Sequence, residues 1–248
     1  MQVIILETWF SDLHAKFILD FVEKQRYIYI IEGLKVTFEV TLLSLFFGML
    51  IGAVIATIRT THDQTREESR KGPGHFILGI GDAICRAYLT VIRGTPTMVQ
   101  LLLWFFVFLK NADSKILVAV VAFSVNSGAY VAEIFRSGIM SIDQGQMEAG
   151  RSLGLSYKDT MLEIIMPQAI KNCLPALVNE MITLLKETSI SGYIGLNELT
   201  RGGEIIRGVT YDAFLPLIVV ALIYLVVVMF FTWCMGILER RLRRSDIR

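Results

Sequence analysis

The chain has 248 residues, of which 54% are hydrophobic, and a mean hydropathy of +0.56. Soluble domains contain about 45–50% apolar residues, so this composition excludes an ordinary soluble domain and predicts an integral membrane protein. The net charge of +1, with basic residues gathered at segment ends, excludes a nucleic-acid-binding surface. Cys85, Cys173 and Cys234 are odd in number and widely spaced in or beside apolar sequence, which indicates packed thiols rather than disulfides or metal ligands.

Residues 1–31 are predicted to form an amphipathic arm in the membrane interface. Apolar side chains recur there at helical spacing with charged residues between them: Phe10, Leu13, Phe17 and Phe21 against Asp12, Lys16 and Glu23. Tyr27 and Tyr29 are suited to anchor the arm at headgroup depth. Plain anchoring is favoured over a regulatory role, and the amino-terminal sequence does not resemble a cleavable signal peptide.

Five apolar stretches are long enough to cross a bilayer, which takes about 20 residues. They cover residues 33–58, 76–109, 116–135, 173–196 and 213–238. The second is interrupted by Arg86, Arg93 and the Gly94, Thr95, Pro96 break, so an additional half-helix and a bent long helix both fit. The predicted fold is an all-α membrane protein with about five transmembrane helices in a domain covering residues 32–242.

Basic residues predict the orientation of these spans. They follow the first span, surround the segment 143–167 and fill the tail 243–248, which places these three regions in the cytoplasm and the amino terminus outside. Lys16, Lys24 and Arg26 lie on the side predicted to be outside, so they weaken this charge asymmetry. The polar residues 60–74 are predicted to form a flexible cytoplasmic insertion.

The segment 143–167 is predicted to be a polar helical hairpin between two apolar stretches. Asp143 and Ser156, followed three residues later by Gln146 and Asp159, are suited to cap two short helices. Gly154 lies where the first helix must end, because glycine adopts the left-handed conformation without steric cost. A polar hairpin in this setting favours contact with a partner over a plain solvated loop.

Ionisable side chains within apolar spans face protein, water or ligand, because each costs about 2.5–3.5 kcal/mol at a helix centre. One helical face of the third span carries Asn126, Tyr130, Glu133 and Ser137. On the fourth span, adjoining stripes carry Glu180, Thr183 and Glu187, and Asn179, Thr183 and Lys186. Groups of both charges suit a zwitterionic solute. Two alternatives to a role in solute binding remain open. Lys186 and Glu187 could extend to the membrane interface near the end of their helix, and the break after Arg93 could be a simple packing kink.

No nucleotide-hydrolysing or metal-binding pattern is found in the sequence. The phosphate-binding loop pattern is absent, and His14, His62 and His75 are scattered without carboxylate partners at metal-ligand spacing. The chain is therefore predicted not to be an enzyme, and any ATP-driven work requires another chain.

The hairpin resembles the cytoplasmic EAA loop of type I ATP-binding-cassette importer permeases. The matching positions are Glu148, Ala149, Gly154, Ile164 and Pro167, while Gly150 replaces an alanine and Met166 a leucine. The stretches RGTPTMVQ, NSGAYVAEIFRSGI, LVNEMITLLKETSI and IGLNELTR resemble the polar amino acid uptake branch of that family. The resemblance covers roughly residues 33–242, without the arm or the insertion.

The resemblance implies a multi-pass permease of the bacterial cytoplasmic membrane that works by alternating access. Its implied partners are a second permease subunit, a dimer of ATPase subunits that binds ATP and Mg²⁺, a solute-binding protein outside the cell, and an amino acid substrate. It implies no cofactor in this chain. The implied ATPase-coupling residues are Met147, Glu148, Ala149, Gly150, Arg151, Ser152, Leu153 and Gly154. The candidate substrate-binding residues are Glu180, Asn126, Tyr130, Glu133, Arg93, Gly94, Thr95, Lys186, Thr188 and Ser189.

Three alternatives remain at this stage. An ATPase-independent transporter or channel leaves the capped hairpin without a purpose, and a membrane enzyme needs an acid–base pair or metal set that the sequence does not offer. The third alternative is an importer of the same class whose solute is an opine, a polyamine or another amino-acid-like molecule instead of an amino acid.

Overall fold

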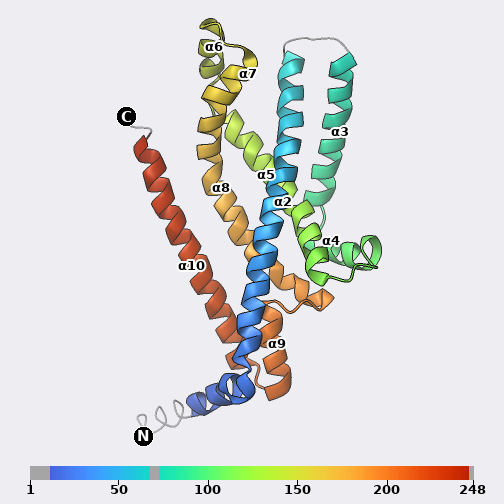
Figure 1. Cartoon of the computed structure of the whole chain (residues 1–248), viewed down its shortest axis with the longest axis vertical. Coiled ribbons are helices and arrows are strands. Elements are labelled where there is room, and N and C mark those ends of the chain that lie inside the picture. Colours follow the sequence, from blue (N-terminus) through green and yellow to red (C-terminus); the bar gives the residue numbers. More distant parts are fainter. Residues whose placement is uncertain (1–11, 68–72, 246–248) are drawn as a thin grey trace.

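The computed structural model describes residues 12–67 and 73–245, and within these ranges every regular element is helical. Three helices are each long and apolar enough to cross a membrane. They are α2 (Tyr27–Glu67), α5 (Lys115–Met140) and α10 (Phe214–Ser245). In Figure 1 they run along the long axis of the molecule, with the arm and α9 (Leu199–Thr210) at the lower end. The all-α membrane fold predicted from the sequence is confirmed.

The second predicted span is a pair of helices with a sharp bend. Its two parts are α3 (Pro73–Arg93) and α4 (Thr97–Leu103), the latter continued by η3 (Trp104–Phe108). The two parts meet at 106° and together satisfy the length and composition of one span. The fourth predicted span, residues 173–196, corresponds to α8 (Met166–Glu187), which is 22 residues long, or about 33 Å at 1.5 Å per residue. Its four ionisable residues are Lys171, Glu180, Lys186 and Glu187.

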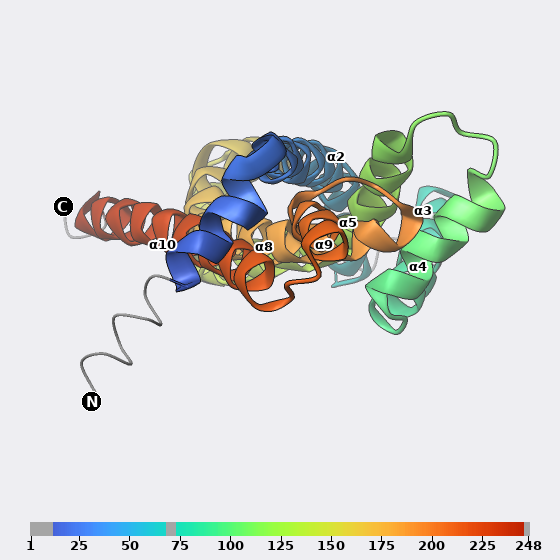
Figure 2. The ribbon, with the colours of Figure 1, turned by 90° about the horizontal axis from the view of Figure 1, so that it is seen from below.

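A helical hairpin occupies the upper end of Figure 1. It comprises α6 (Gln144–Ser152), α7 (Tyr157–Asp159) and η4 (Thr160–Ile165), which leads into α8. At the lower end, η5 (Thr188–Ile194) connects α8 to α9. Seen from below, α5, α8 and α9 lie between α10 on one side and α3 and α4 on the other (Figure 2).

The core is built around α5. In its most apolar stretch 67% of the residues are buried, against 17% in α10, so α5 is the central helix and α10 faces outward. The largest apolar cluster joins Phe123 and Val118 of α5 to Val40 of α2 and Leu184 of α8. Within a membrane the close packing of such side chains, rather than their removal from water, holds each helix in its place.

Two glycines of α2 allow it to approach α5 at backbone distance. A Cβ added to Gly52 would lie 2.6 Å from Val131 Cγ1 and 2.8 Å from the amide nitrogen of Ala132. One added to Gly48 would lie 3.2 Å from the side chain of Ser127. These glycines are four residues apart on one face of α2, a spacing that is typical of close helix pairs in membranes.

The polar segment 60–74 differs from its prediction as a flexible insertion. Helix α2 continues to Glu67 and α3 begins at Pro73, so only residues 68–72 separate the two helices, and they lie outside the described part of the chain. Two ion pairs support the helical extension, because Arg59 contacts Asp82 of α3 at 3.4 Å and Asp63 contacts Arg136 of α5 at 2.8 Å.

The amino-terminal arm ends earlier than predicted, since Tyr27 already begins α2. Phe21 is buried with Leu199 and Ile206 of α9, whereas Phe10 lies outside the described residues. Asp20 of the arm is fully buried, and neither of its carboxylate oxygens has a hydrogen-bond partner among the residues that the structure describes. Desolvation raises the pKa of Asp20.

The contact between α2 and α5 yields a stability prediction. Gly52→Ala should lower the free energy of unfolding by about 1–3 kcal/mol, because the added methyl group has no room against the α5 backbone. Thermal denaturation of the purified chain in detergent measures this loss.

Gly79→Ala in α3 is the matched control, since its added Cβ would find its nearest atom, His62 Nε2, only at 3.9 Å. That change should stabilise the helix by up to about 1 kcal/mol. A Gly52→Ala chain that melts at or above the parent temperature would contradict the close-contact argument.

Candidate functional site

The helical hairpin at the upper end is shaped by local capping. The Asp143 side chain accepts a hydrogen bond from the Gly145 amide at 2.7 Å at the start of α6. Ser156 Oγ accepts from the Asp159 amide at 3.1 Å at the start of α7. Gly154 has a φ of 85°, and the amide of Leu155 donates to the Gly150 carbonyl at 3.1 Å. The caps and the left-handed glycine predicted from the sequence are therefore confirmed.

One tight contact fixes α6 on the following segment. A Cβ on Gly150 would lie 2.5 Å from Thr160 Cγ2 and 2.8 Å from its hydroxyl oxygen. Thr160 is fully buried and donates to the Ser156 carbonyl at 3.0 Å, so it has little freedom to move aside. In this chain the glycine that replaces the alanine of the EAA pattern is thus a steric requirement.

The remaining surface of α6 has no cover in the isolated chain. Leu153 is 83% exposed although it is a large apolar residue. It lies beside polar side chains that are also exposed: Glu148, Arg151 and Ser152. An apolar side chain that projects from a polar, capped helix is typical of an interface anchor.

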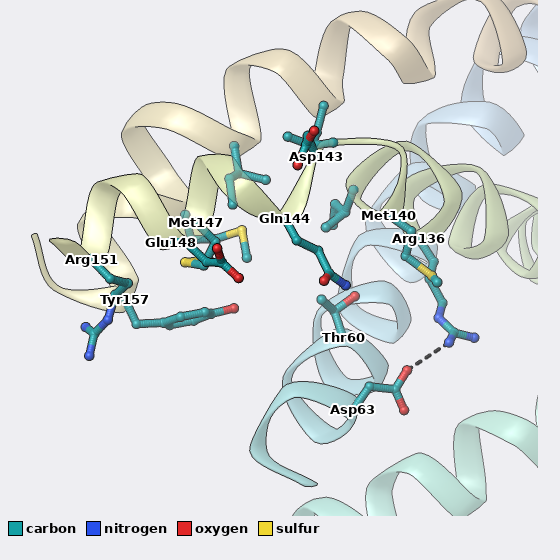
Figure 3. Close-up of a pocket in the computed structure, with 14 residues that line it drawn as sticks. Thr60, Asp63, Arg136, Met140, Asp143, Gln144, Met147, Glu148, Arg151 and Tyr157 are labelled. Atoms are coloured by element: carbon teal, nitrogen blue, oxygen red, sulfur yellow. Dashed lines mark hydrogen bonds and ion pairs between the residues drawn. The ribbon is translucent and has the colours of Figure 1, made fainter. Parts of the chain in front are cut away.

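A pocket of about 360 Å³ lies between this hairpin and the body of the protein (Figure 3). Its walls come from α6 and α7, from the end of α5 and from α2. Charged groups of both signs line it, among them Asp63, Arg136, Glu148 and Arg151. The hairpin is therefore separated from α2 by open space rather than by packed side chains.

Within the spans, the structure brings three of the candidate residues together. The Arg93 guanidinium at the end of α3 donates to the Glu133 carboxylate of α5 and lies 5.5 Å from the centre of the Tyr130 ring. Arg93 and Glu133 side chains are 42% and 40% exposed. An ion pair at this position in a membrane protein requires cover from another chain or from water, because lipid solvates charges poorly.

Gln100 of α4 holds the break between α3 and α4 together. Its amide nitrogen donates to the carbonyl of Ile92 at 2.7 Å and to the hydroxyl of Thr95 at 2.8 Å, which satisfies groups freed by the bend. Its amide oxygen accepts from Asn126 of α5 at 2.9 Å. The structure thus places Asn126 in the support of the break, with only 2% of its surface exposed.

Glu180 of α8 is oriented by Ser127 of α5, whose hydroxyl donates to the Glu180 carboxylate at 2.8 Å. The other α8 candidates are not gathered around it: Lys186 is exposed, and the fully buried Thr188 hydroxyl donates to the Leu185 carbonyl at 2.7 Å. Ser189 is half-buried in η5. The candidates therefore divide into the Arg93 group, the Gln100 group and the Glu180 pair.

Two residues that organise these groups, Gln100 and Ser127, are missing from the set of site residues predicted from the sequence. A glutamine four residues after a proline break is a recognisable signal for a side chain that satisfies the freed backbone. No comparable signal exists for Ser127, because serine in an apolar helix commonly bonds to its own backbone.

These features define a class of protein. A bundle of apolar helices with ionisable residues between them, a broken span and an exposed capped hairpin at one end is a multi-pass membrane permease. Residues 76–244 match the family model described as "Binding-protein-dependent transport system inner membrane component". The chain belongs to this family and is a permease subunit.

Individual relatives cover nearly the whole chain. The arginine transport system permease protein ArtQ of Bacillus subtilis is 37% identical over 221 residues, which are 88% of this chain and 94% of ArtQ. A putative glutamine transport system permease protein, GlnP of Rickettsia typhi, is 33% identical over 92% of this chain and 98% of its own length. A chain in the crystal structure of an amino acid ABC transporter with histidines is 39% identical, with a TM-score of 0.77 over 89% of this chain and 98% of that chain.

The contact between α6 and η4 can be tested by a compensating pair of substitutions. Gly150→Ala should destabilise the permease by about 1–3 kcal/mol through overpacking against Thr160. Thr160→Ala added to the same chain should recover most of this loss, because it removes the two γ atoms in closest contact. A double-mutant cycle on thermal stability, with Thr160→Ala alone as the fourth corner, measures the coupling; additive effects would refute it.

Proposed function

We propose that this permease subunit forms the translocation pathway of an ATP-driven importer of amino acids. The exposed, capped helix α6 carries this proposal, because it offers a rigid docking element at one end of a membrane bundle. The names of the relatives, which are permeases of arginine and glutamine transport systems, support an amino acid as the solute.

A separate ATPase dimer would supply the energy. ATP and Mg²⁺ bind to that partner in this proposal, and residues 147–154 of each permease subunit lie in a groove of one ATPase subunit. When the ATPase dimer closes, it moves the two hairpins together and tilts the attached helices α5 and α8, so that the pathway opens to the other side. The tight contact between Gly150 and Thr160 makes the hairpin stiff enough to transmit this movement.

A second permease subunit would complete the pathway. Arg93 and Glu133 are each about two-fifths exposed in the isolated chain, within helices that must be surrounded by a membrane. A partner subunit of the same family, either an identical copy or a relative, covers such groups at lower cost than lipid does. A solute-binding protein outside the cell would deliver the amino acid to this pair.

The solute would meet Glu180 on its way through. A carboxylate held by Ser127 and pointing between α5 and α8 is suited to the ammonium group that every amino acid carries. Arg93 is the complementary cation for the solute carboxylate, and it exchanges Glu133 for the solute when the pathway opens.

The orientation follows from the distribution of charge. The hairpin and the carboxy-terminal tail lie in the cytoplasm and the amino-terminal arm outside, because Lys and Arg gather at the first two. In this arrangement the chain is a multi-pass protein of the bacterial cytoplasmic membrane.

Docking of the ATPase can be tested at Leu153. Leu153→Asp should abolish retention of the ATPase when the permease is purified from native membranes, because it places a charge at the exposed apolar tip of α6. The permease itself should remain at its normal level, since the side chain is 83% exposed and contributes little to folding.

Tyr211→Asp is the matched control, because Tyr211 directly follows α9, which lies at the opposite end of the molecule from α6 (Figure 1). Tyr211 is 93% exposed, and this variant should retain the ATPase. Unchanged retention in Leu153→Asp would refute the docking role of α6. Absence of any ATPase with the parent chain would refute the ATP-driven function.

The substrate role of Glu180 can be tested by ligand-induced thermal stabilisation. Basic, amide, acidic and sulfur-containing amino acids are added to the purified permease, and a ligand at 100 times its Kd should stabilise it by about 2.7 kcal/mol. Glu180→Gln should lose this stabilisation, whereas Glu204→Gln, at a half-buried surface position in α9, should keep it. Equal stabilisation of both variants would show that the solute binds elsewhere in the subunit.

A further inference from the structure

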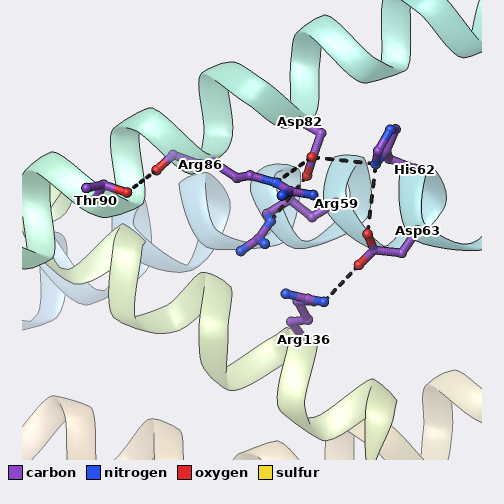
Figure 4. Close-up of polar contacts among 7 residues, drawn as sticks. All are labelled: Arg59, His62, Asp63, Asp82, Arg86, Thr90 and Arg136. Atoms are coloured by element: carbon purple, nitrogen blue, oxygen red, sulfur yellow. Dashed lines mark hydrogen bonds and ion pairs between the residues drawn. The ribbon is translucent and has the colours of Figure 1, made fainter.

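A cluster of charged residues joins three helices (Figure 4). Helix α2 contributes Arg59, His62 and Asp63, α3 contributes Asp82 and Arg86, and α5 contributes Arg136. These residues belong to neither the candidate substrate site nor the docking surface of α6. The cluster consists of two parts that differ in burial and in the helices they connect.

The buried part is centred on Asp82, whose side chain is only 5% exposed. Its carboxylate accepts from Arg86 Nε at 2.7 Å and from Arg59 Nε at 3.4 Å, and His62 Nδ1 lies 3.5 Å away. Removal of one partner from a buried charge network is costly, so the contacts of Arg59 and His62 with Asp82 fasten α2 to α3.

The second part is a single ion pair between α2 and α5. Arg136 Nη2 lies 2.8 Å from Asp63 Oδ2, and the two side chains are 29% and 36% exposed. His62 Nδ1 lies 3.8 Å from the other carboxylate oxygen of Asp63, which links the pair to the buried part. A partly exposed pair of this kind is weak enough to open and close during a working cycle.

The location of this pair connects it to the hairpin. Arg136 lies about one turn before α5 ends at Met140, and α6 begins only four residues later, at Gln144. Asp63 and Arg136 both line the 360 Å³ pocket that separates the hairpin from α2 (Figure 3). The ion pair is therefore a polar contact between α2 and the end of α5 at the edge of this pocket.

We propose that Asp63 and Arg136 are positioning residues for coupling: their ion pair holds the end of α5, and with it helix α6, in a fixed place relative to α2 and α3. The expected effect on transport rests on the proposed function. The expected effect on the position of α6 rests on the geometry of the ion pair alone. The buried Asp82 group provides the fixed anchor, and the Asp63–Arg136 pair is the connection that yields when α6 moves.

The first test measures hydrogen exchange of the α6 backbone in the purified permease, without any ATPase. Asp63→Asn and Arg136→Gln should each lower the protection of residues 144–152 by about fivefold, the scale set by a partly exposed ion pair. Asp63→Glu, which keeps the charge, should restore the protection of the parent. Glu32→Gln is the matched control, because Glu32 pairs with Lys35 at the other end of α2, and it should leave α6 unchanged.

Salt provides the same test without a substitution. Raising the ionic strength from 0.1 to about 1 M shortens the screening length from about 10 to 3 Å and should lower α6 protection in the parent. The same salt step should have no effect in Asp63→Asn. Protection of α6 that responds neither to salt nor to either substitution would overturn the proposal.

The second test measures solute transported per ATP hydrolysed by the reconstituted complex. Loss of the pair should lower this ratio by about fivefold with ATP hydrolysis maintained, the size expected for a lost coupling interaction. A purely structural role would reduce the yield of complex and leave the ratio unchanged, which would overturn the positioning role. A parent complex without solute-dependent hydrolysis would refute the proposed function, and hydrogen exchange would still decide whether the pair positions α6.

Discussion

The structure depends on the close contact between α2 and α5. Because Gly48 and Gly52 lack side chains, the α5 backbone near Ser127 and Ala132 lies directly on α2. This contact fixes the rotation of α5 about its axis. Once that rotation is set, Ser127 points to Glu180 of α8. A helix pair held further apart would leave those polar groups without their partners.

A second constraint is the requirement that polar groups inside a membrane find partners within the protein. The break between α3 and α4 frees backbone groups, and Gln100 satisfies them while it also binds Asn126 of α5. The bend of 106° is thereby fastened to the central helix. The candidate residues Asn126 and Glu180 are thus positioned by hydrogen bonds across helices, and the side chains of the Arg93–Glu133 pair are about two-fifths exposed in the isolated chain.

The hairpin at the upper end is rigid within itself, and a pocket separates it from α2. Local caps and the Gly150–Thr160 contact make α6 and η4 one body, which continues into α8. A pocket and the partly exposed Asp63–Arg136 pair, rather than close packing, lie on the side of this body that faces α2. In the proposed mechanism, a rigid hairpin joined to α2 by a weak ion pair is suited to transmit ATP-driven movement of a partner into a tilt of the attached helices.

The sequence by itself determined the helical membrane fold, the caps at Asp143 and Ser156, the left-handed Gly154 and the family, because each depends on composition or on residues a few positions apart. It also predicted a break after Arg93, but not the bend angle. Only the tertiary structure decided which polar groups meet. Ser127 and Glu180 are 53 positions apart, and Asp63 and Arg136 are 73 apart, so their pairing follows from helix packing. The helical extension of α2 to Glu67 depends on the same packing, since ion pairs to α3 and α5 support a polar segment whose local sequence predicted a flexible loop.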